Sequence, residues 1–154
     1  MLTFEDVKNN PTIRTYIQRA DESLIALGFT EHSFAHVTLV AETAGYILRT
    51  LDYPDRTVEL ARIAGFLHDI GNLVNRVDHS QSGAVMAFRI LDHLDCAPEE
   101  IAEIVTAIGL LMFFSSLGVK KGLTTMLLAH IMFCIPYVIL SVSPKLRSLD
   151  PNLA

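Results

Sequence analysis

Hydrophobic residues near the start of the chain recur at the spacing of an amphipathic helix. From Pro11 to Gly28, apolar side chains fall three and four positions apart, which predicts a helix that the proline opens and the glycine ends. A second helix is predicted from Ser33, whose hydroxyl can cap it, to about Leu51, and Pro54 then prevents its continuation. The pattern is that of helices with one buried face.

The same pattern continues over the next fifty residues. A third helix is predicted after a capping Asp55, with Gly71 as a left-handed terminator, and a fourth begins at His79 or the next residue. Pro98 and the two glutamates after it predict the start of a fifth, because proline suits the first helical position and acidic residues favour the positive end of the helix dipole. No alternating run typical of strands interrupts them. We therefore expect an all-α, helical-bundle fold over residues 1–108.

After Glu103 the pattern changes to long apolar runs. Residues 104–119 carry no charge, two lysines follow, and residues 122–144 supply 23 positions without an Asp, Glu, Lys or Arg. As a helix, the second run would be about 35 Å long, enough to cross a hydrocarbon core of about 30 Å. Two interpretations stay open: a transmembrane segment, or a buried helical hairpin.

Charge separates the same two regions. Residues 1–108 contain 8 Lys and Arg against 16 Asp and Glu, whereas residues 109–154 contain 4 against 1. The acidic first region has no basic cluster to neutralise phosphates, so we expect no nucleic-acid partner. A small substrate held through a metal ion remains compatible with this charge.

The cysteines and the N-terminus bear on the cellular compartment. Cys96 and Cys134 are isolated, with no CxxC spacing, and are predicted to be free thiols in a reducing compartment. The first twelve residues have neither the basic start nor the apolar stretch of a signal peptide. We expect a cytoplasmic location for residues 1–108, with membrane association through residues 122–144 if they form a span.

Four residues carry the candidate chemistry. His36 is followed 32 positions later by His68 and Asp69, and then by His79. A helix that ends at an adjacent histidine and aspartate can direct both side chains to one ion. This mixed nitrogen and oxygen set suits a divalent metal such as manganese, iron, magnesium, nickel or zinc. Such a cation can lower the pKa of water to about 7 and neutralise charge on a phosphoryl group, which favours hydrolysis.

Three segments carry a resemblance to a known family. They read EHSFAHVTLVAETAGYIL, ELARIAGFLHDIGN and DHSQSGAVMAFRIL, and over roughly residues 20–108 they closely resemble the HD-domain superfamily of metal-dependent phosphohydrolases. The resemblance implies a metal-dependent hydrolase of a nucleotide or small phosphate ester. His36 would be the first metal ligand and His68 and Asp69 the catalytic signature pair, while His79 looks like the extra histidine of two-metal branches. A histidine that merely caps a helix is the alternative for His79.

The chain departs from the family pattern after that match. In relatives of this type, the helix that begins PEEIAEIVTAIG should lead to further polar ligands and a final aspartate, but here GLLMFFSSLGVKKG follows. Asp150 lies beyond the apolar run in a proline-flanked tail and is not expected to replace that aspartate. We expect metal binding with impaired hydrolysis, and the alternative is a catalytically silent metal- or nucleotide-binding module.

The C-terminal region has a resemblance of its own. The stretch LLMFFSSLGVKKGLTTMLLAHIMFCIPYVILSVSPKLRSLDPNLA is similar to part of the inner-membrane permease subunit of polyamine-type ABC transporters, and it stops before that family's coupling motif. Two domains are therefore predicted, 1–108 and 109–154, joined as a fusion whose origin the sequence leaves open. A membrane-transport permease fragment is a further functional alternative. Outside a membrane, the apolar segment would pack on the bundle or against a second copy in a homo-oligomer.

Overall fold

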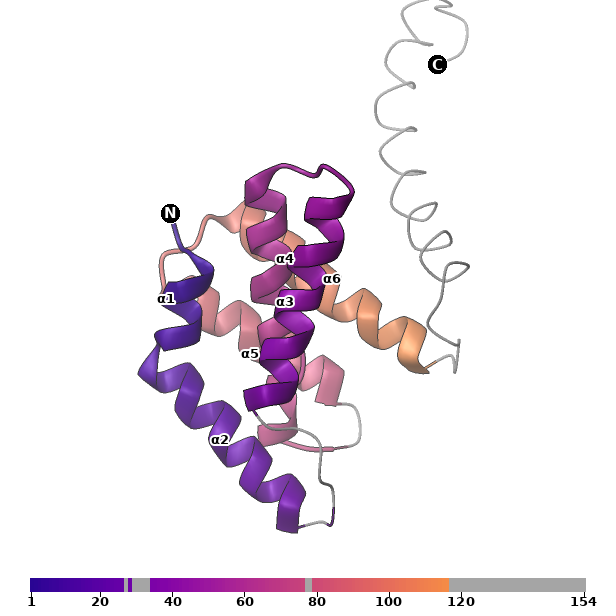
Figure 1. The fold of residues 1–154 in the computed structure, drawn as a ribbon. Coiled ribbons are helices and arrows are strands. Elements are labelled where there is room, and N and C mark those ends of the chain that lie inside the picture. Colours follow the sequence, from indigo (N-terminus) through magenta and orange to yellow (C-terminus); the bar gives the residue numbers. More distant parts are fainter. Residues whose placement is uncertain (27, 29–33, 77–78, 117–154) are drawn as a thin grey trace, which may run out of the picture. The chain divides into compact units, whose positions relative to one another are not determined.

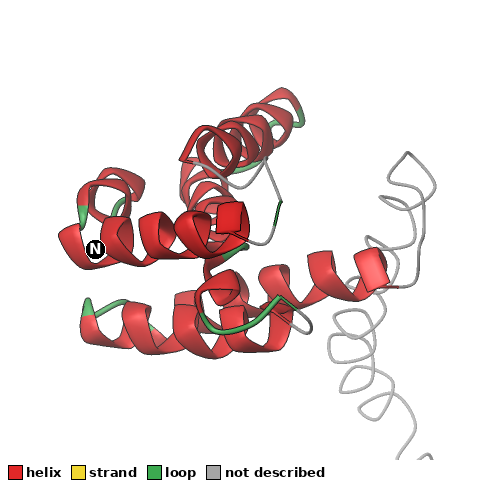
Figure 2. Cartoon of the chain, turned by 90° about the horizontal axis from the view of Figure 1, so that it is seen from below, coloured by secondary structure: helices red, strands yellow, loops and turns green. Residues whose placement is uncertain are grey.

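The computed structural model describes residues 1–26, 28, 34–76 and 79–116, and these residues form helices joined by short connections (Figure 1). No strand occurs among them, as Figure 2 shows, which confirms the predicted all-α class. The elements are, in chain order, α1 (Phe4–Asn9), α2 (Pro11–Ala26), α3 (Phe34–Thr50), α4 (Asp55–Leu67), the 3-10 helix η1 (Ile70–Leu73), α5 (His79–His93) and α6 (Pro98–Ser116).

The second half of helix α4 lies in the core of the bundle. This half is inaccessible on nearly every side, from Ile63 through Leu67, and Phe66 meets the Phe4 ring of α1 edge to face at 5.8 Å between centroids. Helix α3 packs alongside it. At their crossing, a Cβ on Gly65 would lie 3.0 Å from the Ala41 Cα, so glycine permits this approach. The end of α4 is therefore fixed within the core.

The start of α4 is tied to both ends of the described bundle by one arginine. The Arg56 guanidinium donates to both carboxylate oxygens of Glu100 on α6, from Nε at 2.7 Å and from Nη2 at 2.5 Å. Its Nη1 donates to the Leu2 carbonyl and to Glu59. Two-point pairing of this kind fixes geometry as well as charge. Arg56 thus links the chain's N-terminal segment, α4 and α6.

Most predicted helices are confirmed, and two end signals were wrong. Helix α2 spans the predicted stretch and Gly28 has the expected positive φ of 85°, while α5 and α6 begin at His79 and Pro98 as predicted. Asp55, however, is the first helical residue and not a cap, because Pro54 occupies the cap position. Gly71 is not a left-handed terminator either. It lies inside η1, where the backbone remains right-handed and tight. The predicted cap Ser33 lies outside the described residues.

Helix α6 continues beyond the predicted junction at residues 108–109. Its core face is Ile101, Ile104 and Ile108, spaced three and four apart. The chain divides into two compact units, Met1–Met112 and Phe113–Ala154. The predicted division into two domains of different function stays a prediction. No helix within the described ranges is long and apolar enough to cross a membrane, and the predicted span at 122–144 lies outside them.

Candidate metal centre

The buried end of α4 presents two neighbouring side chains in one direction. His68 is the last residue with helical geometry, and Asp69 then adopts φ −100° and ψ 4°, between the helical and extended regions. This conformation is sparsely populated, and many active-site residues adopt it. The α-helix thus ends at the adjacent histidine and aspartate, as the sequence predicts.

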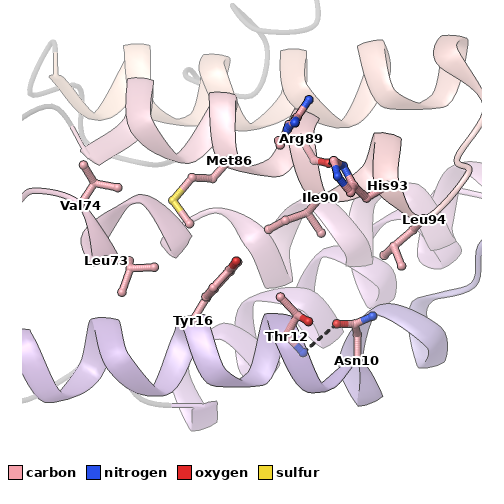
Figure 3. Close-up of a pocket in the computed structure, with 10 residues that line it drawn as sticks. All are labelled: Asn10, Thr12, Tyr16, Leu73, Val74, Met86, Arg89, Ile90, His93 and Leu94. Carbon is pink, nitrogen blue, oxygen red and sulfur yellow. Dashed lines mark hydrogen bonds between the residues drawn. The ribbon is translucent and has the colours of Figure 1, made fainter.

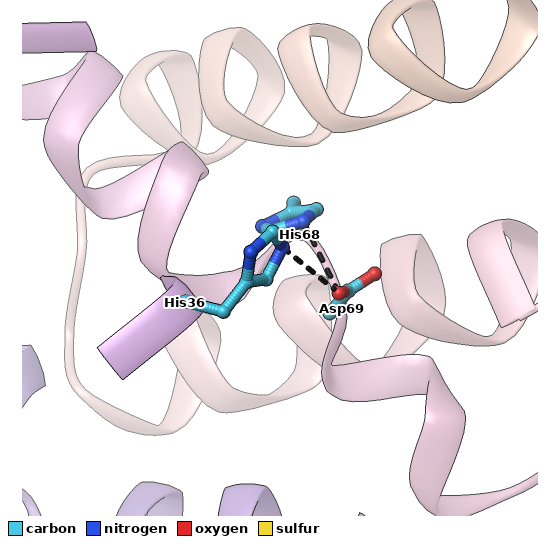
Figure 4. Close-up of side chains that lie close together, drawn as sticks. All are labelled: His36, His68 and Asp69. Atoms are coloured by element: carbon cyan, nitrogen blue, oxygen red, sulfur yellow. Dashed lines mark ion pairs between the residues drawn. The ribbon is translucent and has the colours of Figure 1, made fainter. Parts of the chain in front are cut away.

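His36 joins this pair from the first turn of α3 (Figure 4). The His36 Nε2 lies 3.5 Å from the Asp69 Oδ2, and the His68 Nε2 lies 3.3 Å from the same oxygen. One ligand atom from each of the three residues falls within 4.8 Å of those of the others. The structure therefore brings together three side chains that the sequence proposed as metal ligands, although 32 residues separate the first from the pair.

His79 approaches the other oxygen of the same carboxylate. As the first residue of α5, it places its Nε2 3.6 Å from the Asp69 Oδ1. Its Nδ1 is 2.8 Å from the Arg76 carbonyl oxygen. A carbonyl only accepts hydrogen bonds, so this nitrogen carries the hydrogen and donates, and it does not cap the helix by accepting from a helical N–H. The Asp69 carboxylate thus has histidines at both of its oxygens.

Hydrogen bonds to the far ring nitrogens fix which nitrogen faces the carboxylate. The His68 Nδ1 donates to the Gly65 carbonyl at 2.7 Å, as His79 does to Arg76. A neutral ring of this kind presents an Nε2 lone pair, and two such lone pairs beside the anionic Asp69 repel it unless a positive charge lies between them. Histidines that ligate metals typically donate their second ring N–H in this way. The donor set therefore fits a cation.

The distances agree with that fit. Two ligand atoms that each lie about 2.1 Å from one ion are about 3.0 to 3.4 Å apart at right-angle or tetrahedral geometry. The separations of 3.5 and 3.3 Å from His36 and His68 to the Asp69 Oδ2 are close to this range. A direct hydrogen bond between nitrogen and oxygen is shorter, at about 2.9 Å. The spacing suits a shared cation better than direct contact.

A backbone contact sets the position of α5 against this cluster. A Cβ on Gly71 would lie 1.8 Å from the His79 carbonyl oxygen and 2.4 Å from the Gly83 nitrogen. On the facing side, a Cβ on Gly83 would lie 3.3 Å from the Gly71 nitrogen. The two glycines therefore let η1 lie directly on the first turn of α5. This close approach holds His79 beside Asp69, and it explains the glycine four positions after His79.

The cluster is buried on one side and open on the other. The His68 and Asp69 side chains are 9% and 11% exposed, whereas the His36 side chain is 36% exposed. Solvent therefore reaches the cluster from the side of His36. The low exposure of His68 and Asp69 also reduces the screening of their charge interactions by water.

Asn72 and Arg76 near the cluster were not singled out by sequence reasoning. Asn72 is 4% exposed, its Nδ2 donates to the Asp69 carbonyl at 3.0 Å, and its Oδ1 accepts from the Arg76 guanidinium at 3.1 Å. A polar residue directly after the HDIG segment was the only signal available. Its burial depends on the packing of η1 between α2 and α5, which the sequence pattern does not encode.

One cavity of the described bundle lies apart from the cluster (Figure 3). It has a volume of about 570 Å³, and α2, the end of η1 and α5 line it. None of the four candidate ligands borders it. Its lining is mostly apolar, with Leu73, Met86 and Ile90, while Asn10 before α2 and Thr12 in α2 contribute polar groups. A much smaller cavity touches Asp69 and Asn72.

Comparison with known families identifies the class of the first unit. The HD domain family matches residues 33–111, which is half of the chain and includes all four candidate ligands. The chain belongs to the HD domain family. This family is part of a superfamily of metal-dependent phosphohydrolases. No solved structure matches the chain significantly.

Curated proteins match the chain in part, and they belong to a different class. The spermidine/putrescine transport system permease protein PotC of Escherichia coli (strain K12) is 42% identical over 51 residues, 33% of this chain and 19% of that protein. The protein of the same name from Haemophilus influenzae is 32% identical over 94 residues, 61% of this chain and 34% of that protein. The chain thus spans about a fifth to a third of the length of these relatives.

Proposed function

We propose that the chain is a metal-dependent phosphohydrolase of the HD type that acts on a nucleotide or another small phosphate ester. The observation that carries this proposal is the convergence of His36, His68 and Asp69, whose ligand atoms lie within 4.8 Å of one another. The family match supports the reaction class. The substrate is an inference from the reaction class and from the cluster's open side.

The bound cation would be held by His36, His68 and Asp69, with His79 at the second oxygen of Asp69. When bound, a divalent cation polarises a phosphoryl oxygen and makes water more acidic, which is what phosphate-ester hydrolysis requires. Carboxylate and neutral imidazole together accommodate manganese, iron, magnesium, nickel or zinc. The chain's own contribution is to fix these donor atoms before the substrate arrives.

Each side chain has a separate part in this scheme. His68 is buried and held by the Gly65 carbonyl, so its role is to orient the site. Asp69 provides the anionic charge of the cluster. His36, at the exposed side, is the ligand nearest the path of an incoming phosphate ester. The cluster supplies one anionic carboxylate beside its histidines, so a bound divalent cation would retain a net positive charge. That charge would attract an anionic substrate.

The test is hydrolysis of p-nitrophenyl phosphate and of a nucleotide by the full chain, with Mn²⁺ added and after chelation. Metal-dependent turnover that disappears in His68→Ala and Asp69→Ala is the expected result. Turnover that chelation leaves unchanged, or that both variants retain, would contradict the proposal. Glu22→Ala is a matched control, because this exposed carboxylate pairs with Arg19 on α2.

A catalytically silent metal- or nucleotide-binding module is the second candidate. It is favoured because Asp69 is the single carboxylate that the cluster contains among the described residues, whereas the family pattern includes a further aspartate. Metal binding without turnover on any phosphate ester would favour this candidate over the enzyme.

A contribution to transport is the third candidate, and it rests on the similarity to PotC permeases. Under this proposal, residues 122–144 associate with a membrane, and residues 1–108 form a cytoplasmic domain. The chain corresponds to a minor part of a permease, so transport would require other subunits. Alternatively, the apolar segment is covered within a homo-oligomer.

A further inference from the structure

Asn72 is buried, and both the nitrogen and the oxygen of its side-chain amide form hydrogen bonds. It and His68 are the two polar residues that are buried in the described part of the chain. The Asn72 Nδ2 donates to the Asp69 carbonyl, which only accepts, and the Asn72 Oδ1 accepts from the Arg76 guanidinium, which only donates. One amide orientation satisfies both partners. Aspartate at position 72 would lose the donor, and leucine would lose both functions.

The hydrogen bonds continue from Arg76 to His79. The Arg76 side chain is held by Asn72, and the Arg76 carbonyl accepts from the His79 Nδ1 at 2.8 Å. Asn72 and Arg76 therefore connect the Asp69 backbone with the ring whose Nε2 lies 3.6 Å from the Asp69 Oδ1. The hydrogen bonds thus begin at the Asp69 backbone carbonyl and lead to a ring that faces the carboxylate of the same residue.

This connection crosses a segment with no regular structure. Asn75 and Arg76 lie between η1 and α5 and belong to no helix. The direction of the Arg76 carbonyl is therefore not set by a helical hydrogen-bond pattern. A tether on the Arg76 side chain restricts that direction, and the carbonyl in turn fixes the tautomer and tilt of His79. Partners of this kind typically change metal affinity by about 10- to 100-fold when they are removed.

We propose that Asn72 is a positioning residue that, through Arg76, holds His79 in the orientation required for metal binding at the second oxygen of Asp69. The metal-binding part of this inference rests on the proposed function, whereas the orientation of His79 does not. Asn72 touches neither substrate nor metal in this scheme. It determines whether the cluster offers His79 as a further ligand.

The first experiment needs no metal. Long-range ¹H–¹⁵N NMR of the chelator-treated full chain, above the pH at which histidine is protonated, reports the tautomer of His79. We expect the Nδ1–H form in the unmodified chain and a mixture in Asn72→Ala. Arg76→Met should give the same mixture and guards against an Asn72 variant that fails to fold. Arg76→Lys, which keeps a donor, should restore much of the Nδ1–H form.

Ser82→Ala is the matched control. The Ser82 Oγ donates to the Asn75 Oδ1 at 2.6 Å, so this variant removes a hydrogen bond between the η1–α5 connection and α5 in which neither Asn72 nor Arg76 takes part. Its His79 tautomer should be unchanged. An unchanged tautomer in folded Asn72→Ala or Arg76→Met would overturn the proposal, as would an equal shift in Ser82→Ala.

The second experiment is an Mn²⁺ titration of the same variants. Asn72→Ala should weaken the binding that depends on His79 by about 10- to 100-fold. The double variant with His79→Ala should lose no more than His79→Ala alone, because both changes remove one interaction. Equal Mn²⁺ affinity in the unmodified chain and Asn72→Ala would overturn the proposal. If the unmodified chain binds no Mn²⁺, the proposed function fails, and the tautomer measurement decides the orientation of His79.

Discussion

At the scale of single residues, the hydrogen bond to one nitrogen of a histidine decides what its other nitrogen can bind. His68 and His79 both donate from Nδ1 to a backbone carbonyl, which leaves Nε2 to face Asp69. Each carbonyl lies three residues before its histidine, so local backbone geometry supplies the orientation. These two hydrogen bonds orient the histidine rings before any metal binds.

The variant His79→Ala distinguishes two roles of His79: a metal ligand, or a residue that only caps the start of α5. If His79 contributes to metal binding at the Asp69 Oδ1, the variant should bind less metal while His36 and His68 still hold a cation at Oδ2. Metal content by mass spectrometry and thermal unfolding measure the two effects separately. A residue that only caps α5 would instead cost about 1 kcal/mol of stability and leave the metal content unchanged. That outcome would remove His79 from the site.

The residue types of the cluster could be predicted, while the residues that support them could not. His36, His68, Asp69 and His79 stand out because histidine and aspartate at these spacings suit metal binding. Asn72 stands in an ordinary stretch, and its role arises only when η1 is folded between α2 and α5. Hydrogen bonds that depend on packing leave no periodic signal in a sequence.

At the scale of the elements, the contact between η1 and α5 positions the cluster. Gly71→Ala should lower the stability of the bundle by about 3 kcal/mol or more, because the added Cβ would overlap the His79 carbonyl and the backbone must move. It should also weaken metal binding, since His79 would move with α5. Urea unfolding combined with Mn²⁺ titration measures both effects.

Gly109→Ala is the control for this change. Gly109 lies within α6, and a Cβ there would have no neighbour within 4 Å. Alanine should therefore stabilise the helix by about 0.5 to 1 kcal/mol and leave metal binding unchanged. Equal stability of the unmodified chain and Gly71→Ala would contradict the account of the contact.

The elements themselves were more predictable than their ends. The positions of α2, α5 and α6 were predicted from periodic apolar residues and from prolines. Both signals depend only on residues within one or two helical turns. The end of α4 was predicted wrongly at Gly71, since the chain leaves the α-helix at His68 and continues as η1. Glycine there serves contact with α5, and the sequence does not distinguish that use from a helix terminator. The short helix α1 was not predicted.

At the scale of the whole molecule, one ion pair makes the bundle sensitive to acid. Hydrogen bonds from the Arg56 guanidinium hold the pKa of Glu100 below its ordinary value. A carboxylate whose pKa is lowered by folding stabilises the protein above its ordinary pKa, and this stability is lost as the pH falls through the folded-state pKa. We therefore expect the contribution of the pair to persist at pH 7 and to fade below about pH 4.5.

Glu100→Gln tests this pH dependence. At pH 7 the variant should be less stable by about 1 kcal/mol, because it keeps the shape of the side chain and loses the charge. Below the folded-state pKa of Glu100, the difference between variant and unmodified chain should shrink. Urea unfolding at a series of pH values gives both quantities. A difference that stays constant from pH 7 to pH 3 would contradict the assignment.

The apolar C-terminal segment makes a prediction for the behaviour of the full chain. If residues 122–144 cross a membrane, the protein should sediment with membranes and resist extraction by alkaline carbonate, since soluble monomers seldom expose apolar surface of that size. Monomeric behaviour in sedimentation without detergent would favour the buried-hairpin interpretation. A concentration-dependent oligomer without detergent would instead indicate burial against a second copy.

The central claim is that His36, His68 and Asp69 form one metal site, and metal content tests it most directly. The full chain, loaded with Mn²⁺ and freed of excess, should retain the metal. His68→Ala and Asp69→Ala should weaken Mn²⁺ binding by at least about 100-fold, because the remaining ligands compete poorly with hydration. Both variants should keep their helical circular dichroism. Full Mn²⁺ occupancy in His68→Ala and Asp69→Ala would contradict the account.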